Sequence, residues 1–310
     1  MTTPPPQMNL TLATSTPIQH PGADHNAEDP RNLEDQSIGE VLRRSKNLTE
    51  AQVEQIVQHQ RRHQMRFGEA AVALRLASAD EVLWALSQQF NYSYTKDGVD
   101  RSPELIAARD PFGEQAEAFR DLRSQLLSDA LSMEGTRRAL AVVSPDPGDG
   151  KTFFTANLAI VLSQLGGHTL LIDANLRTPR QRELFGIAHG AGLSGVLLGR
   201  ETTVQAIYKA PDLPGLHVLP AGTIPPNPLE LLQRPGFNVL MQELLNKFDH
   251  VIVDTPAAAH GADAKVIAAK CGSAIALGRN GHSTMKSLEK LTASLDKGAV
   301  KLLGMVMNEH

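Results

Sequence analysis

The sequence has a single cysteine, Cys271, which excludes an intramolecular disulfide bond. No cysteine or histidine accompanies it at metal-ligand spacing, so we expect a buried apolar thiol in a reducing compartment. Long apolar runs are also missing. Stretches such as residues 158–162 are far shorter than the roughly 20 residues that a membrane-spanning helix needs. No basic stretch followed by an apolar run opens the chain, so no secretory signal is expected.

An excess of one charge is absent as well. The net charge of −4 over 310 residues gives no strong attraction to nucleic acid or to an anionic membrane, so no nucleic-acid partner is expected. Action at a membrane would need a partner that holds the chain there. The length is sufficient for one large domain and one smaller domain.

The first third of the chain contains two segments of different composition, a polar tail and a region with helical periodicity. Residues 1–36 are rich in Pro, Thr, Gln, Asn and Asp and lack apolar periodicity, so we expect a disordered tail. Residues 37–94 carry apolar residues at helical spacing behind two predicted capping boxes, Thr49 with Gln52 and Ser78 with Glu81.

Two blocks of this region, which open at Ile38 and Phe67, align on Gly39 and Gly68. They predict a repeated helix-turn-helix unit in a small all-helical domain. Residues 95–112, with a glycine and two prolines, read as a linker to a domain at 113–310.

From residue 113 onward, apolar strands alternate with amphipathic helices. This order predicts an α/β fold with a mainly parallel sheet and flanking helices, and the phosphate-binding loop described next indicates the P-loop NTPase type. The expected strands are 138–144, 168–173, 216–219, 250–254, 273–277 and 302–307, and the expected helices include 114–131, 151–165, 237–247, 263–270 and 284–295.

The strongest chemical signal is the segment Ser144–Thr152, which reads Ser-Pro-Asp-Pro-Gly-Asp-Gly-Lys-Thr between a predicted strand and a helix. Its glycines would let backbone N–H groups face phosphates at a helix N-terminus. Lys151 would reach the β- and γ-phosphates, and the hydroxyl of Thr152 would bind Mg²⁺. The general P-loop pattern has Gly where this chain has Pro145. The predicted ATP-binding residues of the loop are Pro147, Gly148, Asp149, Gly150, Lys151 and Thr152.

Two aspartates end predicted apolar strands, Asp173 and Asp254. Ligands of parallel sheets bind beyond the carboxyl ends of the strands, so both carboxylates should lie near the bound metal. We predict Lys151, Asp173 and Asp254 as catalytic residues and Thr152, Asp173 and Asp254 as metal ligands. Asp263 is either a helix N-cap or a support for this site.

These residues resemble the motifs of the bacterial tyrosine kinases of polysaccharide export. Besides the P-loop, residues 170–177 resemble three apolar residues followed by Asp-x-Asp-x-Arg. Residues 251–256, three apolar residues followed by Asp-x-Pro, resemble the family's three apolar residues followed by Asp-x-x-Pro. Residues 225–232, Pro-Pro-Asn-Pro-Leu-Glu-Leu-Leu, also look like a family signature. The resemblance covers roughly residues 110–310. Arg177 and Asn308 are further candidates for contact with the nucleotide. The spacing of Glu117, Arg120 and Arg123 matches a family motif that packs subunits into a ring, so the resemblance implies a homo-oligomer.

The helical repeats ahead of this domain resemble the EpsG group of chain-length determinant kinases. That resemblance implies a cytoplasmic protein, peripheral to the inner membrane through a membrane-embedded chain-length determinant partner in exopolysaccharide biosynthesis.

The repeats also resemble the N-terminal domain of type II secretion ATPases, some of which bind cyclic di-GMP. Ser37, Lys46 and Arg75 replace key residues of that pattern. We therefore prefer an adaptor without a ligand and keep cyclic di-GMP as the alternative.

Two departures from the kinase family stand out. Asn175 replaces the second Asp of Asp-x-Asp and adds no charge, so Asp173 would act alone. The family's tyrosine-rich tail is missing, and tail autophosphorylation is not expected. Tyr92 and Tyr94 are either alternative acceptors or, as we prefer, packing residues at the end of the helical domain.

The sequence thus predicts an ATP- and Mg²⁺-dependent tyrosine-protein-kinase-like regulator of exopolysaccharide chain length. One alternative is an ATPase switch of the ParA/MinD type. Such proteins commonly carry a second lysine early in the P-loop, which residues 144–147 lack. The other alternative is a nucleotide-gated docking module without phosphotransfer.

Overall fold

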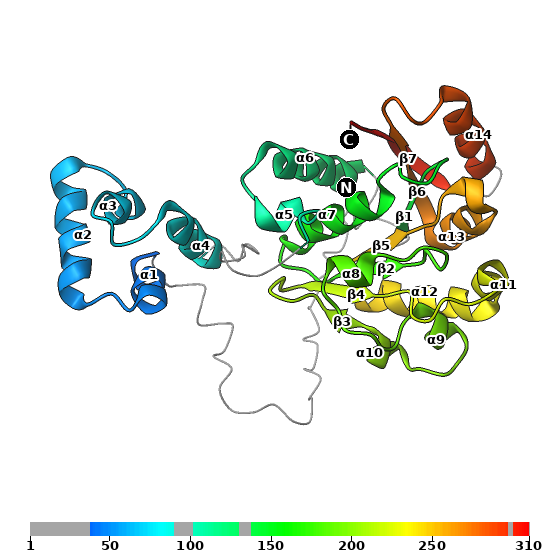
Figure 1. Ribbon diagram of the computed structural model, residues 1–310, viewed down its shortest axis with the longest axis horizontal. Coiled ribbons are helices and arrows are strands. Elements are labelled where there is room, and N and C mark those ends of the chain that lie inside the picture. The colour runs from blue at the N-terminus through cyan, green and yellow to red at the C-terminus, as the bar shows by residue number, and fades with distance from the viewer. Residues whose placement is uncertain (1–37, 90–101, 130–137, 297–299, 310) are drawn as a thin grey trace, which may run out of the picture.

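The computed structural model describes residues 38–89, 102–129, 138–296 and 300–309 (Figure 1). The predicted disordered tail at 1–36, Tyr92, Tyr94 and the first part of the predicted linker lie outside the described residues.

The N-terminal region is helical, as predicted. It contains α1 (Ile38–Lys46), α2 (Glu50–His63), α3 (Phe67–Ala73) and α4 (Ala79–Gln89). Both predicted capping boxes are confirmed. The N–H of Thr49 donates to Gln52 Oε1 at 2.9 Å, and the N–H of Ser78 donates to Glu81 Oε2 at 2.8 Å. Each box supplies partners for the N–H groups that a helix start leaves unpaired.

The two repeats bury one small shared core, to which Leu42, Ile56 and Ala85 contribute fully buried side chains. Helix α1 packs against α3 and α4, and α2 packs against α3. The aligned glycines mark close contacts in both repeats. A Cβ atom on Gly39 would lie 3.3 Å from the ring of Phe67, and one on Gly68 would lie 2.4 Å from Val82 Cγ1.

The second region is built on a sheet of seven strands within the described residues, in the order β3-β4-β2-β5-β1-β6-β7. Every neighbouring pair is parallel except β3 with β4. The predicted strands are all present, and only the two-residue β3 was not expected. Their bounds are β1 (Ala139–Val143), β2 (Thr169–Asp173), β3 (Tyr208–Lys209), β4 (Leu216–Leu219), β5 (His250–Asp254), β6 (Gly272–Arg279) and β7 (Lys301–Asn308).

Helices cover both faces of this sheet. The longer ones lie close to their predicted positions. The bounds are α5 (Ile106–Arg109), α6 (Glu114–Asp129), α7 (Lys151–Ser163), α8 (Gln181–Leu184), α9 (Leu193–Leu197), α10 (Thr203–Ala206), α11 (Pro228–Gln233), α12 (Pro235–Lys247), the 3₁₀ helix η2 (Ala258–His260), α13 (Asp263–Cys271) and α14 (Met285–Asp296).

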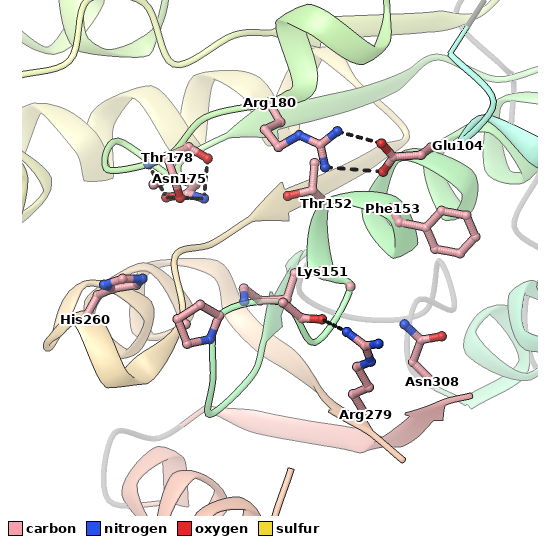
Figure 2. Close-up of a pocket in the computed structure, with 14 residues that line it drawn as sticks. Glu104, Lys151, Thr152, Phe153, Asn175, Thr178, Arg180, His260, Arg279 and Asn308 are labelled. Atoms are coloured by element: carbon pink, nitrogen blue, oxygen red, sulfur yellow. Dashed lines mark hydrogen bonds and ion pairs between the residues drawn. The ribbon is translucent and has the colours of Figure 1, made fainter. Parts of the chain in front are cut away.

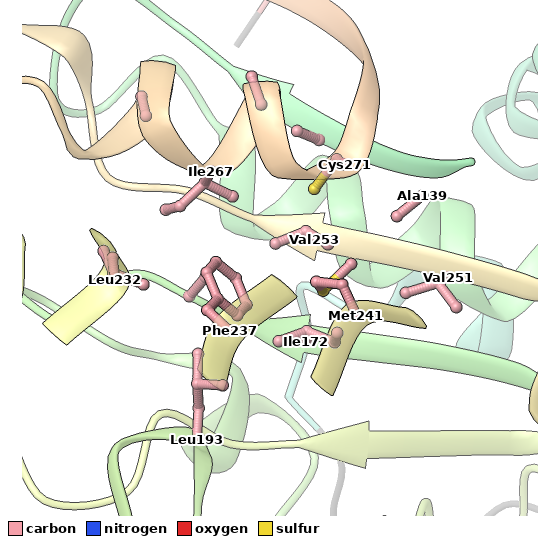
Figure 3. Packing of buried hydrophobic residues seen from close by; sticks show 14 of the residues in the cluster. Ala139, Ile172, Leu193, Leu232, Phe237, Met241, Val251, Val253, Ile267 and Cys271 are labelled. Carbon is pink, nitrogen blue, oxygen red and sulfur yellow. The ribbon is translucent and has the colours of Figure 1, made fainter. Parts of the chain in front are cut away.

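Alternation along the strands gives the sheet two apolar cores. One face of β2 and β5 packs against α12 and α13, where Phe237, Met241 and Ile267 fill the space over Ile172 and Val253 (Figure 3). Cys271 is buried in this core, as expected for an apolar thiol.

The other face of the sheet packs against α7. Helices α5 and α6 cover the outer side of α7, so nearly all of its residues are buried and most of them are apolar. The P-loop helix is therefore held between two layers, which makes it a rigid base for the residues at its N-terminus.

The second half of the predicted linker does not behave as a free connection. Helix α5 lies within it, and Ala107 and Ala108 are buried. Asn157 of α7, fully buried, accepts a hydrogen bond from the N–H of Ala107 at 2.9 Å and donates to the carbonyl of Glu104 at 2.8 Å. This segment is thus part of the P-loop domain.

We expect Gly68→Ala to destabilise the helical domain by about 1–3 kcal/mol, because the added methyl group overlaps Val82 in a packed core. Faster hydrogen exchange within residues 38–89 of the full chain would report the effect. Gly236→Ala is the matched control. It also places a methyl group within a helix, but no atom lies within 4 Å of it. Equal exchange in the two variants would contradict the packing.

Candidate active site

The predicted P-loop connects β1 to α7 and adopts the conformation that its glycines permit. Gly148 and Gly150 have φ values of +85° and +97°, which residues with a side chain rarely adopt. Gly150 is also required for space, because a Cβ atom there would lie 2.3 Å from Asn308 Nδ2. The departure at Pro145 is accommodated since this position has no positive φ, and its carbonyl accepts a hydrogen bond from the N–H of Ala259 at 2.9 Å.

Asp149 points into the loop and not outward. Its buried carboxylate accepts hydrogen bonds from the N–H of Asp146 at 2.8 Å and from the hydroxyl of Ser283 at 2.8 Å. His282 Nδ1 lies 3.0 Å from the same carboxylate. These contacts brace the loop from inside, so Asp149 offers a nucleotide its backbone only.

A pocket of about 500 Å³ opens in front of the loop. Figure 2 shows Asn175 and Thr178 on one side of Lys151, with Arg279 and Asn308 on the other. The volume is in the range of pockets that hold small molecules and cofactors. Its lining comprises Glu104, Pro147, Gly148, Gly150, Lys151, Thr152, Phe153, Asn175, Thr178, Arg180, Ala257, His260, Arg279 and Asn308.

Lys151 is almost fully buried, and its Nζ donates a hydrogen bond to Ser144 Oγ at 2.7 Å. Burial lowers the pKa of this ammonium, while the negative charges of Asp254, Asp149 and Asp146 raise it. The net effect lowers the pKa of Lys151, and the hydrogen bond to Ser144 holds its ammonium group at the loop.

The two predicted carboxylates lie side by side. Asp173 and Asp254 are partners in the register of β2 and β5, and both are fully buried at the carboxyl ends of these strands. They share the rim of the sheet with the P-loop, as the parallel-sheet argument predicted. The structure therefore brings together Lys151, Thr152 and both acids.

Burial and the neighbouring Asp254 raise the pKa of Asp173 to about 8, against the lowering effect of backbone N–H donors such as that of Gln181. Burial also raises the pKa of Asp254, although hydrogen bonds from Thr152 and Gln181 and the charge of Lys151 lower it. Two adjacent buried carboxyl groups disfavour simultaneous ionisation, which a bound cation would relieve.

The oxygen atoms here fit a magnesium ion. Asp254 Oδ1 is buried without a hydrogen-bond partner in the described structure, and the Thr152 hydroxyl lies beside this carboxylate. A hydroxyl and one carboxylate are the protein ligands that P-loop sites supply, with phosphate oxygens completing the shell. No cluster of three or more His, Cys, Asp or Glu side chains suited to a metal occurs in the described ranges.

Asn308 and Arg177, both predicted to contact the nucleotide, lie in different surroundings. Asn308 lines the pocket, and its Nδ2 donates to the carbonyl of Asp149 at 3.1 Å. Arg177 is not among the lining residues. It forms an ion pair with Asp263 at 3.0 Å, at the first residue of α13. Asp263 therefore holds Arg177 and is not the N-cap, which is Ala262.

The sequence did not indicate Glu104, Arg180 and Gln181. Glu104 and Arg180 form an ion pair at 2.6 Å at the edge of the pocket (Figure 2). Glu104 and Arg180 lie far apart in the sequence, and Glu104 falls in the predicted linker. No local pattern therefore indicated that they would meet at the pocket. Gln181 carried only the hint that it follows the Asp173 motif closely.

The predicted oligomerisation residues lie on α6. Arg120 pairs with Glu117 and also contacts the carbonyl of Pro111. Arg123 Nη1 donates to the carbonyl of Val161 on α7 at 2.6 Å. These contacts are within one chain, so the role of the three residues between subunits stays a prediction.

The chain is similar to known nucleotide-binding proteins and kinases. Residues 140–310 match the family model described as the CobQ/CobB/MinD/ParA nucleotide binding domain. The putative tyrosine-protein kinase CapB of Staphylococcus aureus is 34% identical over 197 residues, which cover 63% of this chain and 84% of CapB. The tyrosine-protein kinase wzc of Salmonella typhimurium is 31% identical over 69% of this chain, but the match spans only 30% of that protein.

Among solved structures, the kinase domain of Escherichia coli tyrosine kinase ETK matches with a TM-score of 0.64 and 31% identity, over 69% of this chain and 82% of that domain. The fold and the P-loop site define a nucleotide-binding protein of the MinD/ParA class. Within that class, the chain belongs to the bacterial tyrosine kinase family. None of the helices in the described part of the chain has the length and apolarity of a membrane span.

We expect Asp254→Asn to raise the Tm of the nucleotide-free protein at pH 8 in EDTA. The pKa of Asp254 is raised above 3.8, so its ionisation destabilises the native state, and this penalty grows as the pH rises from about 4. The pKa of Asp173 near 8 extends the effect of the pair to that pH. A gain of about 1 kcal/mol would shift Tm by roughly 2–4 °C.

The measurement is thermal unfolding of both proteins between pH 4 and pH 8, where the gap in Tm should widen. Asp121→Asn, which changes an exposed carboxylate of α6, serves as the control with a constant gap. A lower Tm for Asp254→Asn at pH 8 would show that the buried carboxylate stabilises the fold.

Proposed function

We propose that this chain is an ATP-dependent tyrosine-protein kinase that regulates exopolysaccharide chain length, biosynthesis and export. The observation that carries the proposal is the meeting of Lys151, Thr152, Asp173 and Asp254 at one rim of the sheet. Membership of the bacterial tyrosine kinase family supports transfer of phosphate to a protein tyrosine as the reaction.

Each residue has a role that its setting supports. The glycine-rich loop would bind the phosphates through backbone N–H groups, and Lys151 would offset the charge of the transferred phosphoryl group. Thr152 and Asp254 would hold Mg²⁺, which supplies neutralisation of phosphate charge. Asp173, beside Asp254 at the carboxyl ends of the strands, would orient or deprotonate the attacking hydroxyl. Asn308 would contact the nucleotide beside Gly150, and Arg177 would reach it only by leaving Asp263.

The acceptor tyrosine is proposed to belong to a partner protein. Within the described residues, Tyr208 is half-buried and its hydroxyl donates to the carbonyl of Ala191 at 3.4 Å. We propose a membrane-embedded chain-length determinant as the partner, which would hold this protein at the cytoplasmic side of the inner membrane. Contacts through Glu117, Arg120 and Arg123 would assemble several copies there. The N-terminal helical domain is proposed as an adaptor, with cyclic di-GMP as the alternative ligand to test.

The deciding experiment incubates the full chain with γ-labelled ATP, Mg²⁺ and the cytoplasmic segment of the partner, and then measures labelled phosphotyrosine. We expect labelling by the wild type and a loss of about 100-fold or more in Lys151→Met, because one charge-stabilising group of the transition state is removed. Lys247→Met, which changes an exposed lysine of α12, should label like the wild type.

Release of free phosphate without labelled tyrosine would instead support an ATPase switch of the ParA/MinD type. Binding of ATP with neither activity would leave a docking module controlled by the nucleotide.

A further inference from the structure

Gln181 is a fully buried amide at the start of α8, between the three segments that carry the predicted chemistry. Its Nε2 lies 2.9 Å from Asp254 Oδ2, 2.8 Å from Thr155 Oγ1 and 3.1 Å from the carbonyl of Thr152. Its backbone N–H donates to Asp173 Oδ2 at 3.1 Å. One residue therefore contacts both buried acids and the first turn of the P-loop helix.

The neighbours determine which way the amide points. A carboxylate oxygen and a carbonyl oxygen can only accept hydrogen bonds, so they require the NH₂ end of Gln181 on their side. The opposite orientation would place Oε1 against Asp254 Oδ2 and the carbonyl oxygen of Thr152, neither of which can donate. The NH₂ group must therefore face Asp254, and Oε1 faces away without a hydrogen-bond partner in the described structure.

This contact makes the two oxygens of Asp254 unequal. Oδ2 is occupied by the amide of Gln181, whereas Oδ1 is buried without a hydrogen-bond partner among the described residues. The carboxylate cannot rotate without losing the hydrogen bond from Gln181. Without that bond, Asp254 would keep Thr152 and the backbone of Thr255 as donors but would lose the donor that fixes Oδ2. A metal ligand needs such contacts to keep its orientation.

We propose that Gln181 is a positioning residue for the metal: it holds Asp254 Oδ2, so that Oδ1 stays directed to the Mg²⁺ position beside Thr152. The inference rests on the proposed binding of Mg²⁺ and nucleotide at this site. Gln181 acts through Asp254 and is not itself a ligand. The backbone N–H of Gln181 also donates to Asp173, so one residue fixes both acids relative to each other.

The test is the Mg²⁺ dependence of nucleotide binding, measured with fluorescent ADP on the full chain. Gln181→Met keeps the length of the side chain but removes the donor, and Gln181→Leu removes the donor with a shorter apolar side chain. For both variants we expect affinity for ADP in EDTA within about two-fold of the wild type. The Mg²⁺ concentration for half-maximal enhancement should rise by about 10-fold or more, the usual effect of removing a residue that orients a metal ligand.

Gln164→Met is the matched control, because Gln164 at the other end of α7 also has buried amide atoms but contacts neither acid. Its Mg²⁺ response should equal that of the wild type. An unchanged response in Gln181→Met would overturn the inference while the proposed function stands. An equal loss of affinity with and without Mg²⁺ would also overturn it, because it would indicate a structural role alone. If the wild type itself shows no Mg²⁺-dependent binding, the proposed function fails first.

Discussion

Asp173 and Asp254 lie next to each other, fully buried, at the ends of two hydrogen-bonded strands. Such a pair is unfavourable unless cations and hydrogen-bond donors surround it. Much of the nearby structure supplies them: the ammonium of Lys151, the hydroxyl of Thr152, the amide of Gln181 and backbone N–H groups after β2. Repulsion between the two buried carboxylates therefore destabilises the nucleotide-free site. Binding of a magnesium–nucleotide complex would reduce that repulsion.

Apolar packing around α7 fixes the positions of the groups that surround the two acids. The P-loop helix α7 is covered on one side by the sheet and on the other by α5 and α6, and this packing holds Lys151 and Thr152 at its N-terminus close to the two acids. Asn157 fixes the segment before α5 to the same helix, and Glu104 of that segment pairs with Arg180 at the pocket edge. The part of the chain that leads from the helical domain is thereby in direct contact with the nucleotide site.

The P-loop and the pair of aspartates could be predicted from the sequence, because both follow from the order of neighbouring strands, turns and helices. Strand, glycine-rich turn and helix follow one another at residues 139–163, and the rule that parallel strands present their carboxyl ends together placed Asp173 beside Asp254 correctly. What could not be read depends on contacts between distant segments. Arg177 was expected at the nucleotide but pairs with Asp263, 86 positions away. Gln181 reaches Asp254 across 73 positions, and its only local signal is that it follows the Asp173 motif closely.

The asparagine at position 175 is explained by the same electrostatic constraint. Its Nδ2 donates to the carbonyl of Thr178 at 2.9 Å, a bond that an aspartate could not make. Its backbone N–H also donates to Asp173 Oδ1 at 3.2 Å. A carboxylate here would add a third negative charge beside two buried acids and would raise their pKa further. Asn175 instead braces the turn that presents Asp173 and adds no charge to the site.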